Sequence, residues 1–305
     1  MESLVVMQIA VAAAQDVLFA IAVGALACGV MLGRDAQAVQ AYAATLGRLR
    51  LGALCMLALA CCLYLWSQAA VMSGAPLTEA GQAVTAVLTQ SHFGVAWTAG
   101  FVGVVLAMMG GTRASHAAWL LAAAGAILYT AGKAAASHAA DAGDFTLREA
   151  VHVVHLCATA LWAGSVIVSA FVLGRWNAAF ADTVTRRVTF CTQLSHLATI
   201  ALGVVILTGI YNVTQDTAHL AAPLLSVLYG RLLTLKLALV AVAVALGGVN
   251  RMGCLPRLQA GTIDGSPALH RTQRAFDRLL AIEAVAMLAV LIVAAVLGHT
   301  SPSGG

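Results

Sequence analysis

Long apolar segments alternate with short polar ones along almost the whole chain. Eight apolar stretches lie at about 4–32, 46–73, 92–111, 116–137, 149–174, 189–213, 229–250 and 275–298. An α-helix needs about 20 residues to cross the hydrocarbon core of a bilayer, and each stretch is long enough to do so. The pattern predicts an all-α fold, a polytopic membrane protein with a bundle of eight transmembrane helices.

The polar connections between these stretches are short. The longest are 74–91 and 251–274, and neither has the length of an independently folding domain. We therefore predict that residues 1–305 form a single transmembrane domain.

The composition agrees with a membrane location. Hydrophobic residues make up 61% of the chain, charged residues only 9%, and the mean hydropathy is +0.93. Soluble domains carry about 25% charged residues, so this chain could not cover its apolar surface in water. The net charge of +4 does not indicate a nucleic-acid partner, because basic residues of membrane proteins mostly report the sidedness of loops.

Basic residues concentrate in alternate connections. The first, third, fifth and seventh connections, together with the ends of the spans beside them, carry Arg34, Arg48, Arg50, Arg113, Arg175, Arg186, Arg187, Arg251, Arg257, Arg271, Arg274 and Arg278. Short loops rich in Lys and Arg stay in the cytoplasm. We therefore expect a bacterial inner (cytoplasmic) membrane protein with both termini in the periplasm.

The predicted sidedness places most histidines at one membrane face. Of nine histidines, His92, His138, His152, His155, His219 and His299 fall on the periplasmic side. His152 and His155 are three residues apart near the start of one span, so both imidazoles point to the same side of a helix, about 4.5 Å apart along its axis. Ionisable groups within a span are costly unless they have a function or a partner.

Imidazole is a ligand of copper, zinc, iron and nickel. The clustered histidines therefore predict either a copper site or a haem site, and the candidate copper ligands are His92, His138, His152 and His155. In the haem alternative, a b-type haem would have His152 or His155 as one axial ligand and His92 or His196 as the other. Colour separates the two, because only haem gives a Soret band.

Further candidates for chemistry lie inside the predicted spans. Cys61, Cys62 and Met108 offer soft sulfur ligands along a path for copper, although such residues are usually packing residues. Asp16, Lys133, Lys236 and Glu283 are intramembrane charges. We expect Lys236 to pair with Asp16 or with Glu283, or these charges to serve ion or proton passage.

Motifs of nucleotide-driven or hydrolytic enzymes are absent. The chain has no Walker motif, no GxGxxG and no HExxH. We expect no enzyme activity, with a haem-dependent metal reductase as the alternative. A scaffold that hands metal to a partner without transporting it is a third reading.

Five stretches carry a family resemblance. They are SHFGVAW at 91–97, SHAAD at 137–141, HVVHLCATALWAGS at 152–165, QLSHLATIALGVVILTGIYN at 193–212 and YGRLLTLKLALVAVAVALGGVNR at 229–251. In this order the chain resembles the CopD/PcoD copper-resistance family of inner-membrane proteins over about its C-terminal two-thirds.

The resemblance implies a fold, a substrate and a partner. It implies eight spans, copper as the substrate class, and a periplasmic CopC-like copper-binding protein as partner. It carries a metal-binding role over to His92, His138, His152 and His155, and more weakly to His196 and His299. The function expected is a protein in the lipid bilayer that takes copper at its periplasmic face and moves it across or into the membrane.

Overall fold

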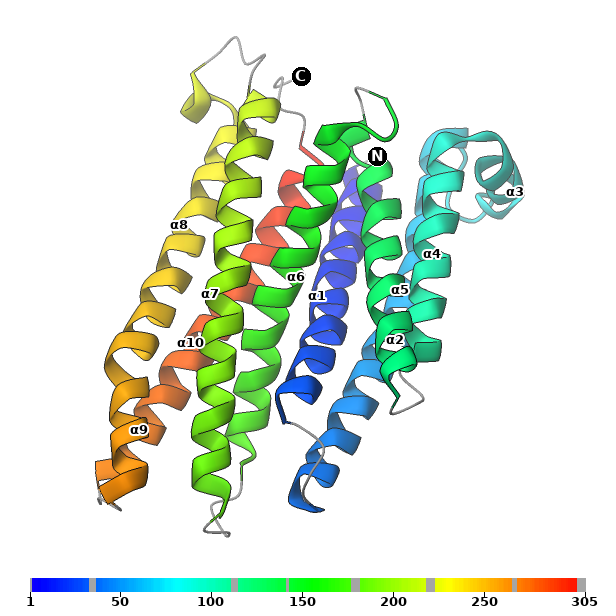
Figure 1. Ribbon diagram of the computed structural model, residues 1–305. Coiled ribbons are helices and arrows are strands. Elements are labelled where there is room, and N and C mark those ends of the chain that lie inside the picture. Colours follow the sequence, from blue (N-terminus) through cyan, green and yellow to red (C-terminus); the bar gives the residue numbers. More distant parts are fainter. Residues whose placement is uncertain are drawn as a thin grey trace.

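The computed structural model describes residues 2–32, 37–110, 115–140, 143–176, 182–217, 223–264 and 268–300. Within these ranges every regular element is helical (Figure 1). The long elements are α1 (Glu2–Leu32), α2 (Gln37–Ser73), α4 (His92–Gly110), α5 (His116–Ala135), α6 (Leu147–Gly174), α7 (Asp182–Thr217), α8 (Leu228–Val249) and α10 (Ala268–Leu297). The short elements are α3 (Gly81–Gln90), η1 (His138–Ala140), η2 (Leu224–Ser226), η3 (Asn250–Cys254) and α9 (Leu255–Asp264).

Eight of the described helices are long and apolar enough to cross a membrane. They coincide with the eight predicted spans, and the prediction of an all-α, multi-pass membrane bundle is confirmed. Large apolar side chains such as Ile200 (69% exposed) and Leu207 (72% exposed) face outward from the bundle. Such faces are stable against lipid and not against water.

Two of the connections hold helices that hydropathy did not predict. Residues 74–91 contain α3, which packs Val87 against Leu65 and Ala69 of α2. Residues 251–274 contain most of η3, which is a π-helical turn, then α9 and the start of α10. A hydropathy window detects segments that cross the bilayer, and it does not detect short helices that lie at its surface or extend a span.

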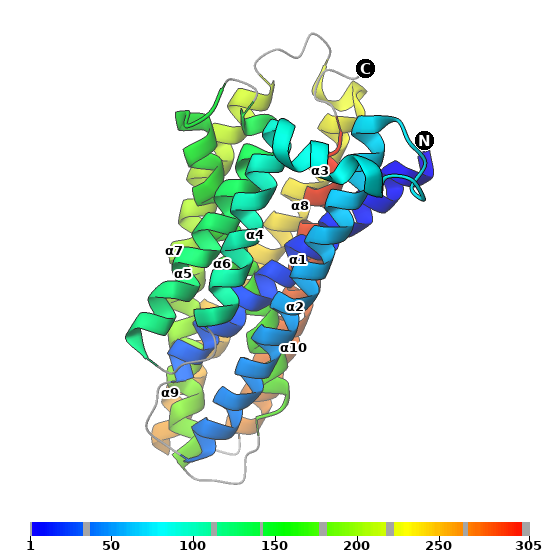
Figure 2. The same cartoon turned by 90° about the vertical axis from the view of Figure 1, so that its right-hand side faces the viewer.

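The helices pack around α1, which contacts α2, α6 and α10. On one side α4 and α5 form a close pair, and on the other side α7 and α8 flank α6 and α10 (Figure 1). We call the end of the bundle where α1 begins the histidine end, because α4 and α6 also begin there with His92, His152 and His155. The opposite end, where α9 and the start of α10 lie, is the arginine end. Figure 2 shows α3 lying across the bundle at the histidine end.

Small residues bring α1 and α6 into backbone contact. A β-carbon added to Gly24 would lie 2.1 Å from the carbonyl oxygen of Gly164, and one added to Gly164 would lie 1.9 Å from that of Ala20. No side chain fits at either position without separating the helices. The contact fixes the position of α6, which carries the histidine pair.

Candidate functional site

The histidine pair lies in the second and third turns of α6. The helix begins after Thr146, whose side-chain oxygen accepts a hydrogen bond from the backbone N–H of Glu149. This cap satisfies one of the free N–H groups of the first turn and defines where the helix starts. The rings of His152 and His155 are nearly parallel, with an interplanar angle of 19° and centroids 6.4 Å apart.

Two polar side chains of α7 hold the pair. Asn212 Nδ2 lies 3.3 Å from His152 Nδ1, and Thr208 Oγ1 lies 2.9 Å from His155 Nδ1. Thr208 and Asn212 are four residues apart, so they face α6 from successive turns of α7. Between them Gly209 leaves room for the ring, because a β-carbon there would lie 3.4 Å from His155 Cε1.

The hydrogen bonds of Thr208 indicate which ring nitrogen of His155 carries the proton. The Thr208 hydroxyl donates to the carbonyl oxygen of Val204 at 2.6 Å, so its oxygen is free to accept from His155 Nδ1–H. The proton position is inferred from the heavy atoms, and this pattern places it on Nδ1. The Nε2 lone pair of His155 is then the one that can bind a metal ion.

The separation of the two rings suits a shared ion. A metal–imidazole bond is about 2.0 Å long, so two imidazoles on opposite sides of one ion have centroids about 6 Å apart. The observed 6.4 Å agrees with this value. The pair can supply two nitrogen ligands to one ion only if a free nitrogen of each ring turns toward that ion.

The other predicted ligands lie at the same end of the bundle but are not all gathered at the pair. His92 opens α4, and its Nε2 lies 2.7 Å from Asp144 Oδ1, with both side chains about half exposed. His138 begins η1. Among the residues that the structure describes, no three His, Cys, Asp or Glu side chains lie close enough together to hold one metal ion. The metal-binding role of His92, His138, His152 and His155 stays a prediction.

Two further histidines lie apart from the pair. His299 is held at both ring nitrogens, by Tyr64 Oη at 3.1 Å and by the carbonyl oxygen of Ala295 at 2.8 Å. His196 lies on the exposed surface of α7, twelve residues before Thr208 and therefore about 18 Å from it along the helix. At that distance His196 and His155 cannot be the two axial ligands of one haem. His219 lies outside the described residues.

The intramembrane charges pair differently from the sequence-based expectation. Asp16 of α1 forms an ion pair with Lys133 of α5 and not with Lys236. Glu283 of α10 lies in another part of the bundle, beside Gly247 of α8. The expectation was wrong about Asp16 because the pairing depends on which helices are neighbours, and the positions of the spans in the sequence do not fix this.

The soft candidate ligands are spread over different environments. Cys61 is buried in the main core, whereas Cys62, the next residue on α2, is exposed. Met108 packs at the edge of the same core. None of them adjoins the histidine pair through a contact that the structure describes, so their part in a copper path stays a prediction.

Comparison with known families gives two matches. The model of the family described as "Copper resistance protein D-like, N-terminal domain" matches residues 1–147. The model of the family described as "Copper resistance protein D" matches residues 188–297. Together they cover most of the chain, but α6 after Leu147, which carries His152 and His155, and the start of α7 lie outside both matches. No curated protein and no solved structure matches the chain.

Proposed function

From the membership of this chain in the copper resistance protein D family, we propose that it takes copper at its histidine end and moves it across or into the membrane. The family places the chain in copper resistance and homeostasis, and the eight apolar helices make it a multi-pass membrane protein. In this proposal the membrane is the bacterial inner membrane. The histidine end and both termini face the periplasm, because the arginine-rich connections belong in the cytoplasm.

The observation that carries the proposal is the histidine pair itself. His152 and His155 lie side by side near the start of α6, and the Nδ1 of each ring lies beside a polar group of α7. The Nδ1–H of His155 donates to Thr208, which orients the ring and makes its Nε2 a better metal ligand. The amide of Asn212 instead donates to Nδ1 of His152, so this amide has to turn or release the ring before His152 Nε2 can bind a metal ion. Imidazole nitrogen suits copper in both of its common oxidation states.

His92 and Asp144 fit a role at the entrance. Both are half exposed, and Asp144 lies in the segment that leads into α6. A carboxylate hydrogen-bonded to a histidine increases the basicity of the ring as a ligand. We propose that His92 and His138, the first residue of η1, receive copper before it reaches the pair. The natural donor would be a periplasmic CopC-like copper-binding protein.

The proposal requires neutral imidazole rings. A protonated imidazole has no lone pair to give to a metal, so copper binding and proton binding compete. Copper affinity at this site should therefore fall as the solution becomes more acidic. The proposal includes no enzymatic step, and the driving force would be a gradient or a partner protein.

Replacement of both histidines tests the proposal. We expect His152→Ala combined with His155→Ala to abolish copper binding by the purified protein and copper uptake by proteoliposomes. The matched control replaces His116 and His270, two exposed histidines at the arginine end, and should bind copper as the wild type does. Wild-type copper affinity in the first double variant would remove the pair as the site.

Haem is the competing ligand for the same rings. The geometry does not bring His196 to the pair, and no observation in the described residues favours haem over copper. An absorption spectrum before and after reduction decides the question. A reducible Soret band would turn His152 and His155 into candidate axial ligands.

A further inference from the structure

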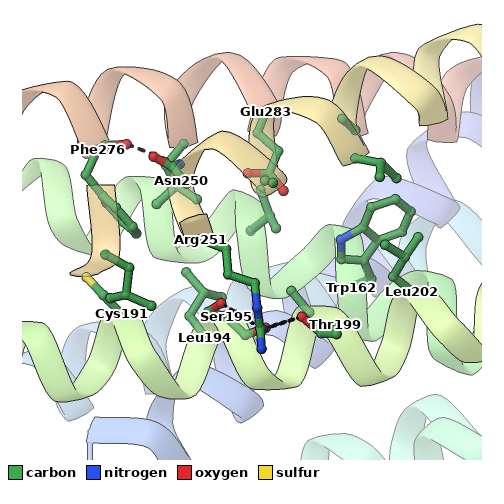
Figure 3. A pocket seen from close by; sticks show the side chains of 18 residues that line it. Trp162, Cys191, Leu194, Ser195, Thr199, Leu202, Asn250, Arg251, Phe276 and Glu283 are labelled. Carbon is green, nitrogen blue, oxygen red and sulfur yellow. Dashed lines mark hydrogen bonds between the residues drawn. The ribbon is translucent and has the colours of Figure 1, made fainter. Parts of the chain in front are cut away.

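A second polar site lies deeper in the bundle, in the half nearer the arginine end. A cavity of about 240 Å³ lies between α6, α7, α8, η3 and α10 (Figure 3). Trp162 of α6 lines it, seven residues after His155 and therefore about 10.5 Å further along the helix. The cavity is thus separate from the histidine pair but follows it along α6 and α7.

Glu283 of α10 lines this cavity without a partner. The side chain is only 4% exposed, and among the described residues it has no hydrogen bond and no ion pair. Its carboxylate faces α8, where a β-carbon on Gly247 would lie 3.1 Å from Glu283 Oε1. Glycine at position 247 therefore makes the space that the carboxylate occupies.

A second acceptor without a donor lies in the same cavity. Asn250 begins the π-helical turn η3 and is 4% exposed. Its Nδ2 donates to the carbonyl oxygen of Phe276 at 3.5 Å, but its Oδ1 is buried with no hydrogen-bond partner in the described part of the chain. Single π-helical turns inside α-helices occur frequently at functional sites, since the extra residue redirects side chains.

The other ionisable groups of the cavity do not neutralise Glu283. Arg251 follows Asn250, but its Nη1 donates to Ser195 O at 3.0 Å, to Ser195 Oγ at 3.1 Å and to Thr199 Oγ1 at 2.6 Å, all on α7 (Figure 3). Cys191 of α7 is a buried free thiol. The residues of α6, α8 and α10 that line the cavity include no titratable group other than Glu283.

An unpaired carboxylate and an unpaired amide oxygen cost free energy inside a membrane protein unless something binds them. A buried acceptor without a donor costs about 1–3 kcal/mol, and a bare charge costs more. A water needs only about 10–15 Å³ of such space, so a cavity of about 240 Å³ can hold a cation with several waters.

We propose that this cavity is a cation-binding site, in which the Glu283 carboxylate binds the cation directly and the Asn250 amide oxygen binds it directly or through water. Carboxylate and amide oxygens suit a proton or a hard ion such as Na⁺. A copper ion that leaves the histidine pair is the third candidate cation, and the thiol of Cys191 offers a soft ligand for it. The site does not depend on copper binding at the histidine pair.

Infrared difference spectroscopy of the full chain in lipid tests the proposal. The buffer is exchanged in three arms, from alkaline to acidic, from Na⁺-free to Na⁺-containing, and from copper-free to Cu(I)-containing. We expect at least one arm to change a carboxyl band that belongs to Glu283, and we expect Glu283→Gln to abolish the change in this band. Glu79→Gln removes an exposed carboxylate near α3 and is the matched control, which should keep the change.

The arms identify the cation. A response to acid alone identifies a proton site, a response to Na⁺ identifies a sodium site, and a response to Cu(I) identifies a copper site. The copper arm is repeated in the His152→Ala, His155→Ala variant, where a surviving response shows that the cavity binds copper even if the outer site does not. Gly247→Ala should shift the bands without abolishing them, because it crowds the carboxylate. Glu283→Gln spectra identical to wild type in all three arms would overturn the proposal.

Discussion

The hydrogen bond between Thr208 and His155 gives the sharpest prediction about the histidine pair. Thr208→Val keeps the shape of the side chain and removes its oxygen, the group that accepts from His155 Nδ1–H at 2.9 Å. The ring then loses the contact that fixes its tautomer and orientation. We expect the variant to fold, since the lost hydroxyl otherwise bonds only to carbonyl oxygens of its own helix.

The size of the effect follows from what hydrogen-bonded partners contribute to metal affinity. Loss of a hydrogen-bonding partner of a metal-binding histidine typically weakens metal affinity about 10–100-fold. This corresponds to about 1.4–2.8 kcal/mol of binding free energy.

The assay is competition for copper between the purified protein and a chromophoric chelator. Thr208→Ser keeps the hydroxyl and should bind nearly as the wild type does. Thr214→Val lies on the same helix, is exposed, and loses only a bond to the carbonyl of Tyr211, so it is the matched control. If Thr208→Val and Thr214→Val bind copper with the same affinity, the tautomer argument for His155 is wrong.

Four further predictions follow from other contacts. Asn212→Leu should weaken copper binding because it removes the amide that orients the His152 ring, and an unchanged chelator competition would contradict this. Asp16→Asn should lower the free energy of unfolding by about 3 kcal/mol because it leaves Lys133 unpaired, and combining it with Lys133→Met should recover part of the loss in thermal unfolding. Gly164→Ala should destabilise the fold by about 1–3 kcal/mol, whereas Gly29→Ala, with open space around it, should not. Copper affinity should fall in acidic buffer, and a titration without this fall would exclude histidine ligands.

The spans and the histidine pair were predictable because each depends on local sequence. The thickness of the bilayer sets the length of an apolar run, and a spacing of three residues places His152 and His155 on one side of any helix. The end of the bundle at which His92 lies was also predictable, because it follows from the number of spans that precede this residue. These inferences need no knowledge of which helices touch.

The contacts between helices were not predictable in this way. Asp16 pairs with Lys133, and not with Lys236, because α1 and α5 bring these charges together in the bundle. Glu283 lines a cavity because α10 faces Gly247 of α8. The positions of the spans in the sequence do not say which helices are neighbours in the bundle. Such pairs can therefore be identified only in the three-dimensional structure.

The residues that hold the histidine pair in place were only partly predictable from the sequence. Thr208 and Asn212 belong to the TG-x-x-N motif that carries part of the family resemblance, but nothing in that motif says that it faces His155 and His152. The π-helical turn at Asn250 had no signal, because the apolar run of α8 continues to it without a break.

The most direct test of the central claim is metal analysis of the purified protein together with its absorption spectrum, before and after reduction. The proposal predicts stoichiometric copper in the wild type, no Soret band, and loss of that copper in the His152→Ala, His155→Ala variant. Copper retained in that variant, or a reducible Soret band in the wild type, would contradict it.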